Sequence, residues 1–537
     1  MGVNLSEGVD MKKGRVEAIL EHWGPCLSSA LADELVRRFG VSTSNARQLI
    51  KRSTAKRLKG ISFPHRVGFI YLTPQYGSMI FFDRLVEALK STNHACGHGL
   101  AALADRGGVL PIDHFKIACG APKVQAKQLS AERVAEQLIA ANLIKQLDLV
   151  GIGECLALAS FTDEDEQLAF LDLNARLKVE KMALDAVRDW VRRLGIGSWN
   201  KVRVRDEGVI PTAGPNYWDL SAPSYLHPLL GSSGSRSDSS TSPSTKPKPG
   251  SFVCDVYLGK RLTVGAAKAF IKKCQNVRGF VNVSPVLQMF LAESYEKDAV
   301  HAIRAAGAIA ATLDSLLGTD VAQALHELAS VLKSTALNLG SPEKIDVLFS
   351  ALGKIAGAEG TLRGCLFEYL CAELANELYR NPVIRINRVV RSSDGARAEI
   401  DVLMESRTEA VFIECKGHLP TGRVDDAEVE KWLRKRLPVL RDFAKHNEDL
   451  RNLKQTYELW TNAEISPASK ALIEEENAKT TRYSIAYREG LELMAMIKES
   501  GNISLLKTYQ QHFSNHPLAV ATRRKISRKT SNSETNQ

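Results

Sequence analysis

Hydrophobic and polar positions near the start of the chain follow a helical period, and two short strand-like runs come after it. Apolar residues recur at three- and four-residue intervals from 28 to 39, a Gly-Val-Ser turn follows, and a second helical pattern spans 43–56. Two short runs of strand-forming residues, 68–72 and 78–82, come next, separated by a five-residue turn. We therefore predict a helix-turn-helix followed by a β-hairpin.

This order of elements resembles a winged-helix domain, here over residues 12–90, and implies DNA binding. The second predicted helix carries polar and basic side chains that suit phosphates and base edges: Asn45, Arg47, Gln48, Lys51, Arg52, Lys56 and Arg57. A protein-binding winged helix with a solvated basic face is the alternative. A weaker repeat at 91–160 predicts a tandem arrangement, with helices at 100–105, 111–119 and 131–142 and strands near 144–149 and 155–158.

The middle of the chain predicts an α/β domain at residues 165–290. Its expected elements are a helix at 168–194, strands at 201–205, 216–222 and 252–257, a helix at 264–274 and a strand at 280–283. A Ser-rich segment, 231–251, cannot build a core and is expected to be a disordered loop between two of these strands. Residues 291–356 predict a helical connector, and 520–537 a basic disordered tail.

The last third of the chain, residues 357–515, predicts the element order α-β-β-β-α-β. We expect a helix at 362–379, strands at 383–391, 397–404 and 409–416, a helix at 424–445 and a strand at 456–461. Side chains alternate along a strand, so Glu414 and Lys416 share one face, and Asp401 on the neighbouring strand can meet them. Two carboxylates side by side need a cation to stay ionised, and oxygen ligands suit Mg²⁺ or Mn²⁺.

Gly-x-x-x-Glu on the first helix, Glu-Ile-Asp-Val-Leu on a strand and Glu-Cys-Lys-Gly thirteen residues further on resemble the PD-(D/E)xK, restriction-endonuclease-like nucleases. The resemblance covers about residues 355–490. It implies that Asp401 and Glu414 bind the catalytic metal, with the Cys415 carbonyl as a further ligand. Lys416 would position the attacking water or stabilise charge on the phosphate, and Glu368 would support the metal or its water. Asp401 follows Ile400 where the family often has proline.

The central domain repeats this order of elements in a degenerate form. Glu180, Asp219 and Asp255 occupy the carboxylate positions, but Tyr257 stands where the lysine belongs. We therefore predict an inactive nuclease-like fold that binds DNA or dimerises; an unrelated α/β domain is the alternative.

Composition limits the remaining function classes. The 537 residues carry 71 Lys and Arg against 61 Asp and Glu, a net charge of +10 that favours a polyanionic partner. The most apolar stretch, 302–317, is interrupted by Arg304 and Asp314, which predicts a buried helix and no membrane span. The polar residues 1–10 lead us to expect a protein that is not secreted, and the nine scattered cysteines fit a reduced cytoplasm.

Two weaker signals remain. Five residues lie close enough in sequence to ligate zinc, but their spacing matches no common zinc finger: His94, Cys96, His98, His114 and Cys119. No ATP-binding loop is present in the sequence, so any motor or targeting function would come from a partner protein.

Together these patterns predict a multidomain α/β protein. It would have an N-terminal tandem winged helix, a central degenerate nuclease-like domain and a C-terminal PD-(D/E)xK domain. The predicted function is a cytoplasmic, Mg²⁺- or Mn²⁺-dependent DNA endonuclease in host defence or mobile-element processing. The alternatives are a non-catalytic DNA-binding regulator or scaffold and a structure-specific repair or recombination nuclease. One complete set of site residues leaves both a homodimer and nicking open.

Overall fold

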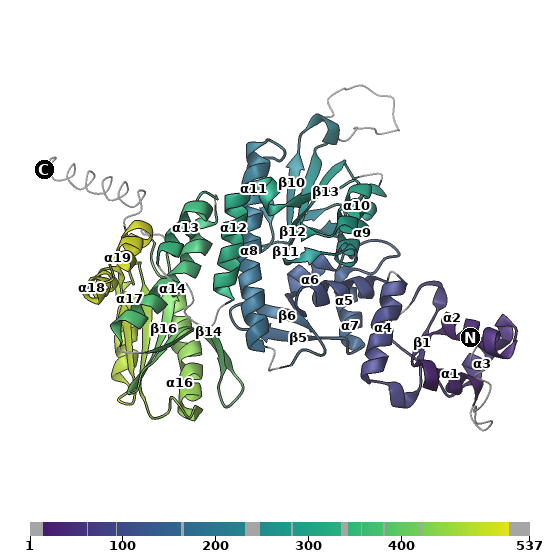
Figure 1. The fold of residues 1–537 in the computed structure, drawn as a ribbon, viewed down its shortest axis with the longest axis horizontal. Helices are drawn as coiled ribbons and strands as arrows, with labels where there is room; N and C mark the ends of the chain where they lie inside the picture. Colours follow the sequence, from purple (N-terminus) through teal and green to yellow (C-terminus); the bar gives the residue numbers. More distant parts are fainter. Residues whose placement is uncertain are drawn as a thin grey trace, which may run out of the picture.

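The computed structural model describes residues 14–61, 63–92, 94–162, 166–230, 248–280, 283–333, 342–355, 357–379, 382–418 and 422–514. The protein is a multidomain α/β structure in which the N-terminal helices and a C-terminal sheet lie at opposite ends (Figure 1). The Ser-rich residues 231–247 and the basic tail lie outside the described residues. Within those residues, no helix has both the length and the apolar character needed to cross a membrane.

The N-terminal module consists of three helices and three short strands. They are α1 (Arg15–Trp23), β1 (Cys26–Leu27), α2 (Ser28–Phe39), α3 (Thr43–Arg52), β2 (Lys56–Arg57) and β3 (Phe69–Tyr71), with the strand order β1-β3-β2. Gly40 ends α2 in the left-handed conformation, at φ 62°, and the Ser42 side chain accepts a hydrogen bond from the backbone of Asn45 to start α3. The predicted helix-turn-helix is therefore present.

The predicted hairpin is wrong in one of its strands. Ser78 caps a helix, α4 (Met79–Ser91), whose buried Phe81, Leu85 and Leu89 recur every four residues, so helical packing decides this segment. β3 pairs instead with β1 on one side and with β2 on the other, and β2 can form because α3 already ends at Arg52. Lys56 and Arg57 consequently lie on β2 and not on the helix where they were predicted.

The second module has the same order of elements as the first. It comprises α5 (Ala95–Asp105), β4 (Val109–Pro111), α6 (Ile112–Ala118), α7 (Ala131–Ala140), β5 (Ile144–Leu149) and β6 (Gly153–Leu158), with the strand order β4-β6-β5. The predicted helix capped by Ser130 and the two predicted strands are present. Gly120, at φ 70°, lets the module approach the backbone of Ala269 so closely that a Cβ would lie 2.6 Å from its carbonyl oxygen.

The central unit is a five-stranded sheet with the order β13-β12-β11-β10-β7. Its elements are α8 (Glu166–Arg193), β7 (Arg203–Val204), the hairpin β8 (Thr212–Ala213) and β9 (Asn216–Tyr217), β10 (Leu220–Ser224), β11 (Gly250–Leu262), α9 (Val264–Arg278), β12 (Val286–Tyr295), α10 (Lys297–Ala305), β13 (Ile309–Thr312), α11 (Leu313–Leu317) and α12 (Thr319–Leu332).

Two predictions for this part of the chain are wrong. The fourth strand is β12 rather than 280–283, and residues 291–356 are not all helical because they contain the end of β12 and all of β13. The expected buried helix at 302–317 is likewise interrupted by β13. Alanine favours helices in isolation, but Ala292 and Ala311 are buried within the sheet, and tertiary packing overrides that preference.

The C-terminal unit follows α13 (Glu343–Leu352) and agrees with its predicted elements. It contains α14 (Glu359–Leu378), β14 (Val383–Arg391), β15 (Arg397–Glu405), β16 (Glu409–Lys416), α15 (Asp426–Lys431), the π-helical turn η4 (Trp432–Arg436), α16 (Leu437–His446), β17 (Lys454–Thr461), α17 (Pro467–Ala478), β18 (Ser484–Arg488), α18 (Gly490–Ser500), α19 (Ile503–Tyr509) and η5 (Gln510–Ser514). The strand order is β14-β15-β16-β17-β18.

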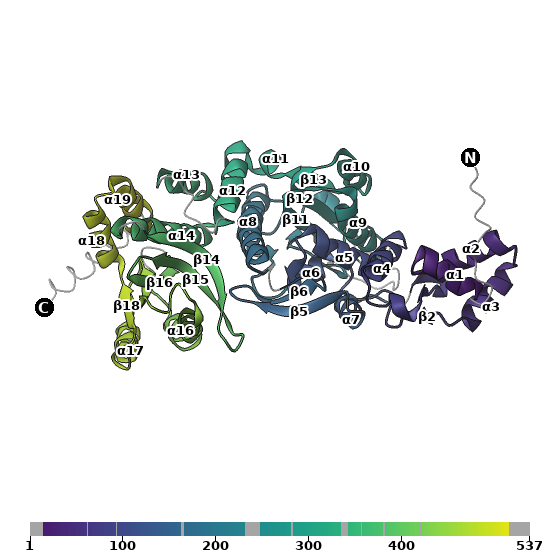
Figure 2. The same ribbon diagram turned by 60° about the horizontal axis from the view of Figure 1, so that its bottom comes forward.

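The two large sheets share one topology. In each, the first three strands pair antiparallel and the last two join in parallel. The helices α8, α12, α13 and α14 lie between the sheets (Figure 2), and their side chains form one hydrophobic core with both. The repeated order of elements predicted for the central unit is therefore present, although its fourth strand lies further along the chain.

Candidate functional site

Asp401 and Glu414 lie side by side in the C-terminal sheet. The pairing of Val402 with Ile413, continued by one residue, sets Asp401 on β15 opposite Glu414 on β16. Both side chains are buried, and Oδ2 of Asp401 accepts a hydrogen bond of 2.7 Å from the backbone N–H of Cys415. The strand alternation in the sequence had predicted this pairing of carboxylates.

Two basic side chains form ion pairs with Glu414. Lys416 Nζ is 3.0 Å from Oε1 of Glu414 on the same face of β16, as predicted. Arg436 forms a second ion pair with the same oxygen. Its position was not predicted, because it depends on the π-helical turn η4, a feature that a regular helical pattern does not show.

Two further carboxylates complete the acidic cluster. Glu368, predicted from the sequence, lies on α14, and its Oε2 is buried and accepts no hydrogen bond among the described residues. Glu399 was not predicted, although it precedes Asp401 by two residues on β15 and therefore shares its face. Gly151 of the β5–β6 turn lies against it: a Cβ there would be 2.9 Å from Oε2 of Glu399.

Lys178 reaches this cluster from α8 of the central unit. Its Nζ lies 3.9 Å from Oε1 of Glu368, and its side chain is about three-quarters buried. Burial lowers the pKa of Lys178, but Cys365, Glu368 and Glu399 outweigh burial and raise it above the ordinary value. The site is therefore composite, because a residue of the central unit contributes charge to the C-terminal unit. Sequence reasoning missed Lys178, whose helix lies about 190 residues before Glu368 in the chain.

The carboxylates of the cluster perturb one another. Burial and then the neighbouring Glu414, Glu368 and Glu399 raise the pKa of Asp401 well above its usual range. Burial, followed by the charge of Glu368, raises the pKa of Glu399 to about 7. Burial lowers the pKa of Lys416, but Glu414 and Asp401 raise it overall, so the ammonium stays protonated. Because the carboxylates raise one another's pKa values, a further cation would favour the ionised form of the cluster.

The central unit contains a matching set of carboxylates, which we call the sister cluster: Glu180, Asp219 and Asp255. The pairing of Leu220 with Cys254, continued by one residue, sets Asp219 opposite Asp255. Oδ2 of Asp219 accepts a hydrogen bond of 2.7 Å from the N–H of Val256, the residue after Asp255. This is the same contact, at the same position, as that between Asp401 and Cys415. The sequence correspondence between the two units is thus repeated in hydrogen bonding.

Basic side chains of the protein neutralise the sister cluster. Arg205 donates to Asp219 at 2.7 Å and to Glu180 at 2.5 Å, and all three side chains are buried. Lys273 of α9 pairs with Asp255. Burial raises the pKa of Asp219, but Arg205 and the Val256 N–H lower it overall. Among the described residues no guanidinium donates a hydrogen bond to Asp401, although Arg436 interacts with it electrostatically, and the pKa of Asp401 is raised where that of Asp219 is lowered.

The metal predicted for the C-terminal site fits this chemistry in part. The donor set is all oxygen, and the buried, unbonded Oε2 of Glu368 is free to accept a cation. Cys415 faces the opposite side of β16, and only its backbone lies at the site. Across the residues that the structure describes, no three His, Cys, Asp or Glu side chains are already drawn together as a metal cage. The five residues considered for zinc, from His94 to Cys119, likewise form no metal-binding group among the described residues. His94 instead accepts a hydrogen bond from the Cys96 backbone and caps α5.

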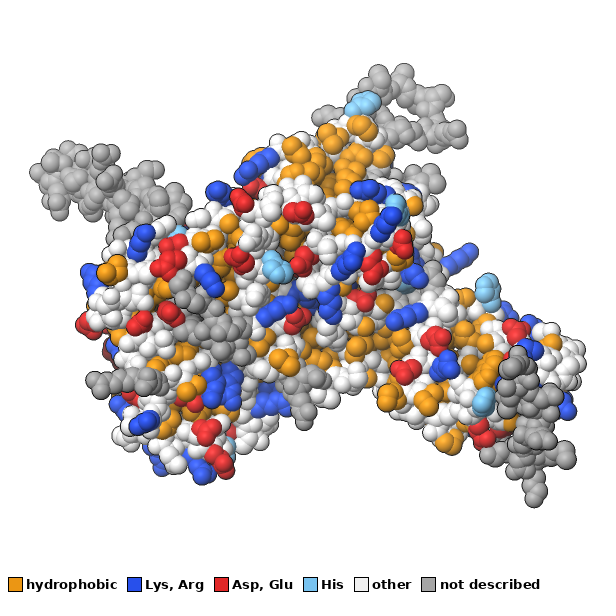
Figure 3. All heavy atoms as spheres, in the orientation of Figure 1, with side chains coloured by type: hydrophobic (Ala, Val, Ile, Leu, Met, Phe, Trp, Pro, Cys, Tyr) orange, Lys and Arg blue, Asp and Glu red, His pale blue; other side chains and the backbone are white. Residues whose placement is uncertain are grey.

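The predicted DNA-binding side chains occupy the exposed face of α3, while Ala46 faces the core. These exposed residues are Asn45, Arg47, Gln48, Lys51 and Arg52. Lys56 and Arg57 on β2 are also exposed, and Arg57 donates to the carbonyls of Arg66 and Val67. Basic side chains are not confined to this module: on the face in Figure 3 they are interspersed with acidic ones over all units.

Comparisons with known proteins add little to this geometry. No protein-family model matches the chain, and no curated protein matches it. One matching solved structure is the crystal structure of a protein of unknown function, AF1548, with 18% sequence identity and a TM-score of 0.19. The match covers 25% of this chain and 65% of that chain, so this chain spans just under two thirds of its length. We therefore infer function from the geometry of the site alone.

Proposed function

We propose that the protein is a metal-dependent endonuclease acting on DNA, with its active site at the C-terminal carboxylate cluster. The contrast between the two clusters carries this proposal. In the sister cluster Arg205 lies between Glu180 and Asp219. At the corresponding place beside Asp401, the described residues supply a backbone N–H and no hydrogen-bonded cation. A divalent ion there would play the part that Arg205 plays in the central unit.

Each residue of the cluster then has a role that follows from its position. Asp401, Glu414 and Glu368 would hold Mg²⁺ or Mn²⁺, with the carbonyl of Cys415 as a further oxygen ligand. When bound, the ion would supply Lewis-acid stabilisation of the charge that develops on the scissile phosphate. Lys416, kept protonated by Glu414, would orient the attacking water or stabilise that same charge.

Glu399 extends the set predicted from the sequence. A carboxylate with a pKa near 7 is matched to proton transfer at neutral pH, where it can accept a proton and release it again. Glu399 shares the face of β15 that carries Asp401, and there it would take a proton from the attacking water. We assign it the part of general base, with Lys416 as the cationic partner.

The proposed DNA-binding surface lies in the N-terminal module, which resembles a winged helix. Asn45, Arg47, Gln48, Lys51 and Arg52 on α3, with Lys56 on β2, would contact the duplex. The second module and the central unit would extend this platform toward the site. Host defence or mobile-element processing in the cytoplasm is the proposed setting, alone, as a homodimer, or with a partner that supplies ATPase or targeting functions.

A non-catalytic DNA-binding scaffold is the second candidate. It is favoured by the two ion pairs of Glu414, which already neutralise one of the carboxylates that a metal would need. A repair or recombination nuclease with structure-specific cleavage would use the same residues and differ only in substrate.

Cleavage assays with the full chain separate these candidates. Supercoiled, linear, single-stranded and branched DNA, and RNA, are incubated with Mg²⁺, Mn²⁺ or EDTA. We expect metal-dependent cleavage of DNA that falls at least a thousandfold in Asp401→Asn and in Lys416→Met, since each removes a charge used in the transition state. Tyr257→Phe, at the position in the central unit that matches Lys416, is the control and should retain activity.

Absence of cleavage under every condition, or cleavage that survives both substitutions, would refute the nuclease proposal. Duplex binding without cleavage would favour the scaffold instead. Cleavage restricted to branched substrates would assign the repair or recombination class.

A further inference from the structure

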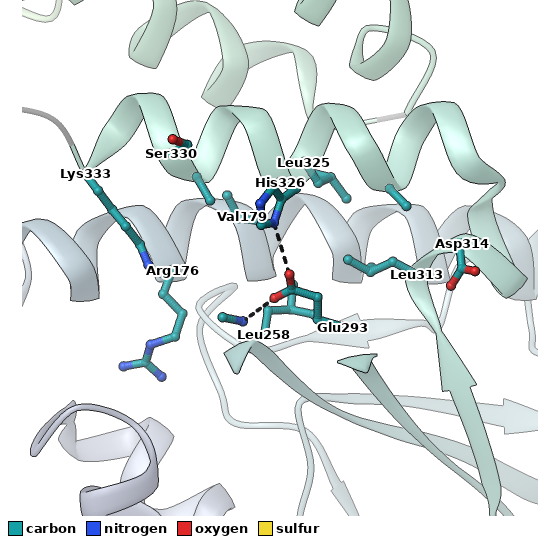
Figure 4. Close-up of a pocket in the computed structure, with 13 residues that line it drawn as sticks. Arg176, Val179, Leu258, Glu293, Leu313, Asp314, Leu325, His326, Ser330 and Lys333 are labelled. Carbon is teal, nitrogen blue, oxygen red and sulfur yellow. Dashed lines mark hydrogen bonds and ion pairs between the residues drawn. The ribbon is translucent and has the colours of Figure 1, made fainter. Parts of the chain in front are cut away.

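A pocket of about 440 Å³ lies in the central unit, between α8, α12 and the ends of β11 and β12 (Figure 4). Cavities of roughly 300–1,000 Å³ with apolar walls and a few convergent polar groups are typical small-molecule sites. The apolar wall comes from Val179, Leu258, Leu313, Leu325 and Ala329. The C-terminal carboxylate cluster takes no part in lining it.

The repeat of the fold shows that this space is specific to the central unit. Gly259 N–H donates to Glu293 at 2.9 Å, and at the matching position in the C-terminal unit His418 N–H donates to Asn462 at 2.8 Å. Around that second contact the space is filled: Phe367, which precedes Glu368, packs on Phe513 with ring centroids 5.4 Å apart. In the central unit the corresponding residue, before Glu180, is the smaller Val179. Aromatic rings fill this space in the C-terminal unit, whereas in the central unit it remains a pocket.

One end of the pocket is cationic. Lys333 and Arg176 line this end, with the Arg176 guanidinium directed away from the middle of the pocket, and Asp314 lies at the other end (Figure 4). The Arg176 side chain is 94% buried, and its Nη2 donates to the carbonyl of Arg106 at 3.1 Å. Its Nε and Nη1 make no hydrogen bond with the described residues, although Nη1 lies 3.9 Å from Oε1 of Glu180. Lys333 pairs with Asp172 at 2.6 Å, in a contact exposed enough to exchange for another anion. Buried unsatisfied guanidinium nitrogens are costly, and an anionic group at this end would offset that cost.

The middle of the pocket offers hydrogen-bond acceptors beside the apolar wall. Glu293 accepts from Gly259 through one oxygen and pairs with His326 at 3.0 Å through the other. A carboxylate has about four acceptor positions, so these contacts leave room for N–H donors of a ligand. A ligand that matches the pocket has an anionic end, a flat or apolar body and polar N–H groups in between.

We propose that this pocket binds one nucleotide through its 5′-phosphate, with the phosphate at Lys333 and Arg176 and the base against Leu325, Ala329 and Val179 near Glu293. The nucleotide is either a free mononucleotide or the 5′-phosphorylated end of a strand, since both present the same group. This site does not depend on catalysis at the C-terminal cluster, so its test stands independently of the nuclease proposal.

Calorimetric titration of the full chain tests the proposal with AMP, adenosine, inorganic phosphate, and a short deoxyadenylate strand with and without a 5′-phosphate. Lys333→Met should weaken binding by about ten- to a hundredfold, because a charge-assisted contact to phosphate is lost. Ala329→Phe imitates the aromatic filling of the C-terminal unit and should abolish binding. Glu327→Gln, on the same helix but outside the pocket lining, should change affinity less than about twofold.

AMP binding that both Lys333→Met and Ala329→Phe weaken supports a free-nucleotide site. If only the 5′-phosphorylated strand binds, and both substitutions weaken that binding, the result supports a strand-end site. Far-ultraviolet circular dichroism confirms that each variant is folded, and Lys333→Met alone decides the question if Ala329→Phe is not. Three results would overturn the proposal: no binding in any arm at millimolar concentration, phosphate binding as tightly as AMP, or adenosine binding as tightly as AMP. Binding that neither Lys333→Met nor Ala329→Phe changes would overturn it as well.

Discussion

Arg205→Met tests whether a protein cation holds the sister cluster together. The substitution keeps an unbranched side chain of similar reach but removes the donors to Asp219 and Glu180. Both carboxylates are at most 3% exposed, so neither regains hydration when its partner is lost. Removing one partner of a buried ion pair costs about 3–5 kcal/mol. Proton uptake by Asp219 limits the penalty, and we therefore expect about 3 kcal/mol.

Differential scanning calorimetry of the metal-free chain is the assay. At about 2–4 °C per kcal/mol for a unit of this size, the transition of the central unit should fall by roughly 6–12 °C. Arg203→Met, two residues earlier on β7 but exposed, is the control and should shift the transition by no more than about 2 °C.

The pH dependence supplies an independent check. Arg205 keeps the folded pKa of Asp219 below its unfolded value, so the stabilisation is present above about pH 4 and disappears as pH falls through the folded pKa. The difference in melting temperature between Arg205→Met and the parent protein should therefore become smaller at acidic pH. Equal melting temperatures of Arg205→Met and Arg203→Met at neutral pH would show that the Arg205 guanidinium does not stabilise the sister cluster. The comparison that supports the metal site would then fail.

Three further predictions concern the other parts of the molecule. Because the folded pKa of Glu399 is raised to about 7, metal-free stability should fall by on the order of 3 kcal/mol as pH rises from about 4.5 to 8, and Glu399→Gln should flatten that slope in thermal melts. Lys178→Met should destabilise the chain by about 2 kcal/mol by leaving Glu368 uncompensated, whereas exposed Lys181→Met should cost less than about 0.5 kcal/mol; equal melting of the two would contradict the composite site. Arg47→Ala with Lys51→Ala should weaken duplex binding and reduce the slope of log affinity against log salt by about 1.8, measured by fluorescence anisotropy; an unchanged slope would assign α3 to protein contacts.

Prediction from sequence succeeded where one local pattern dominates. The strands that carry Asp401 and Glu414 are apolar, alternating and bounded by turns, so their limits agree with the structure to within a residue. It failed where two patterns compete. Residues 78–82 form a short run of strand-forming residues, but the helical repeat of Phe81, Leu85 and Leu89 continues beyond them and prevails.

The sequence by itself determined which residues could do chemistry: two carboxylates and a lysine on adjacent strands, and a second set without the lysine. It did so because strand alternation and pairing are local rules. Only the tertiary structure decided which charges surround them. Lys178, Arg436 and Arg205 reach their carboxylates from separate helices and loops, and burial makes each such contact decisive. The same fold therefore holds an internally neutralised cluster in one unit and, in the other, an aspartate to which no guanidinium of the described residues donates a hydrogen bond.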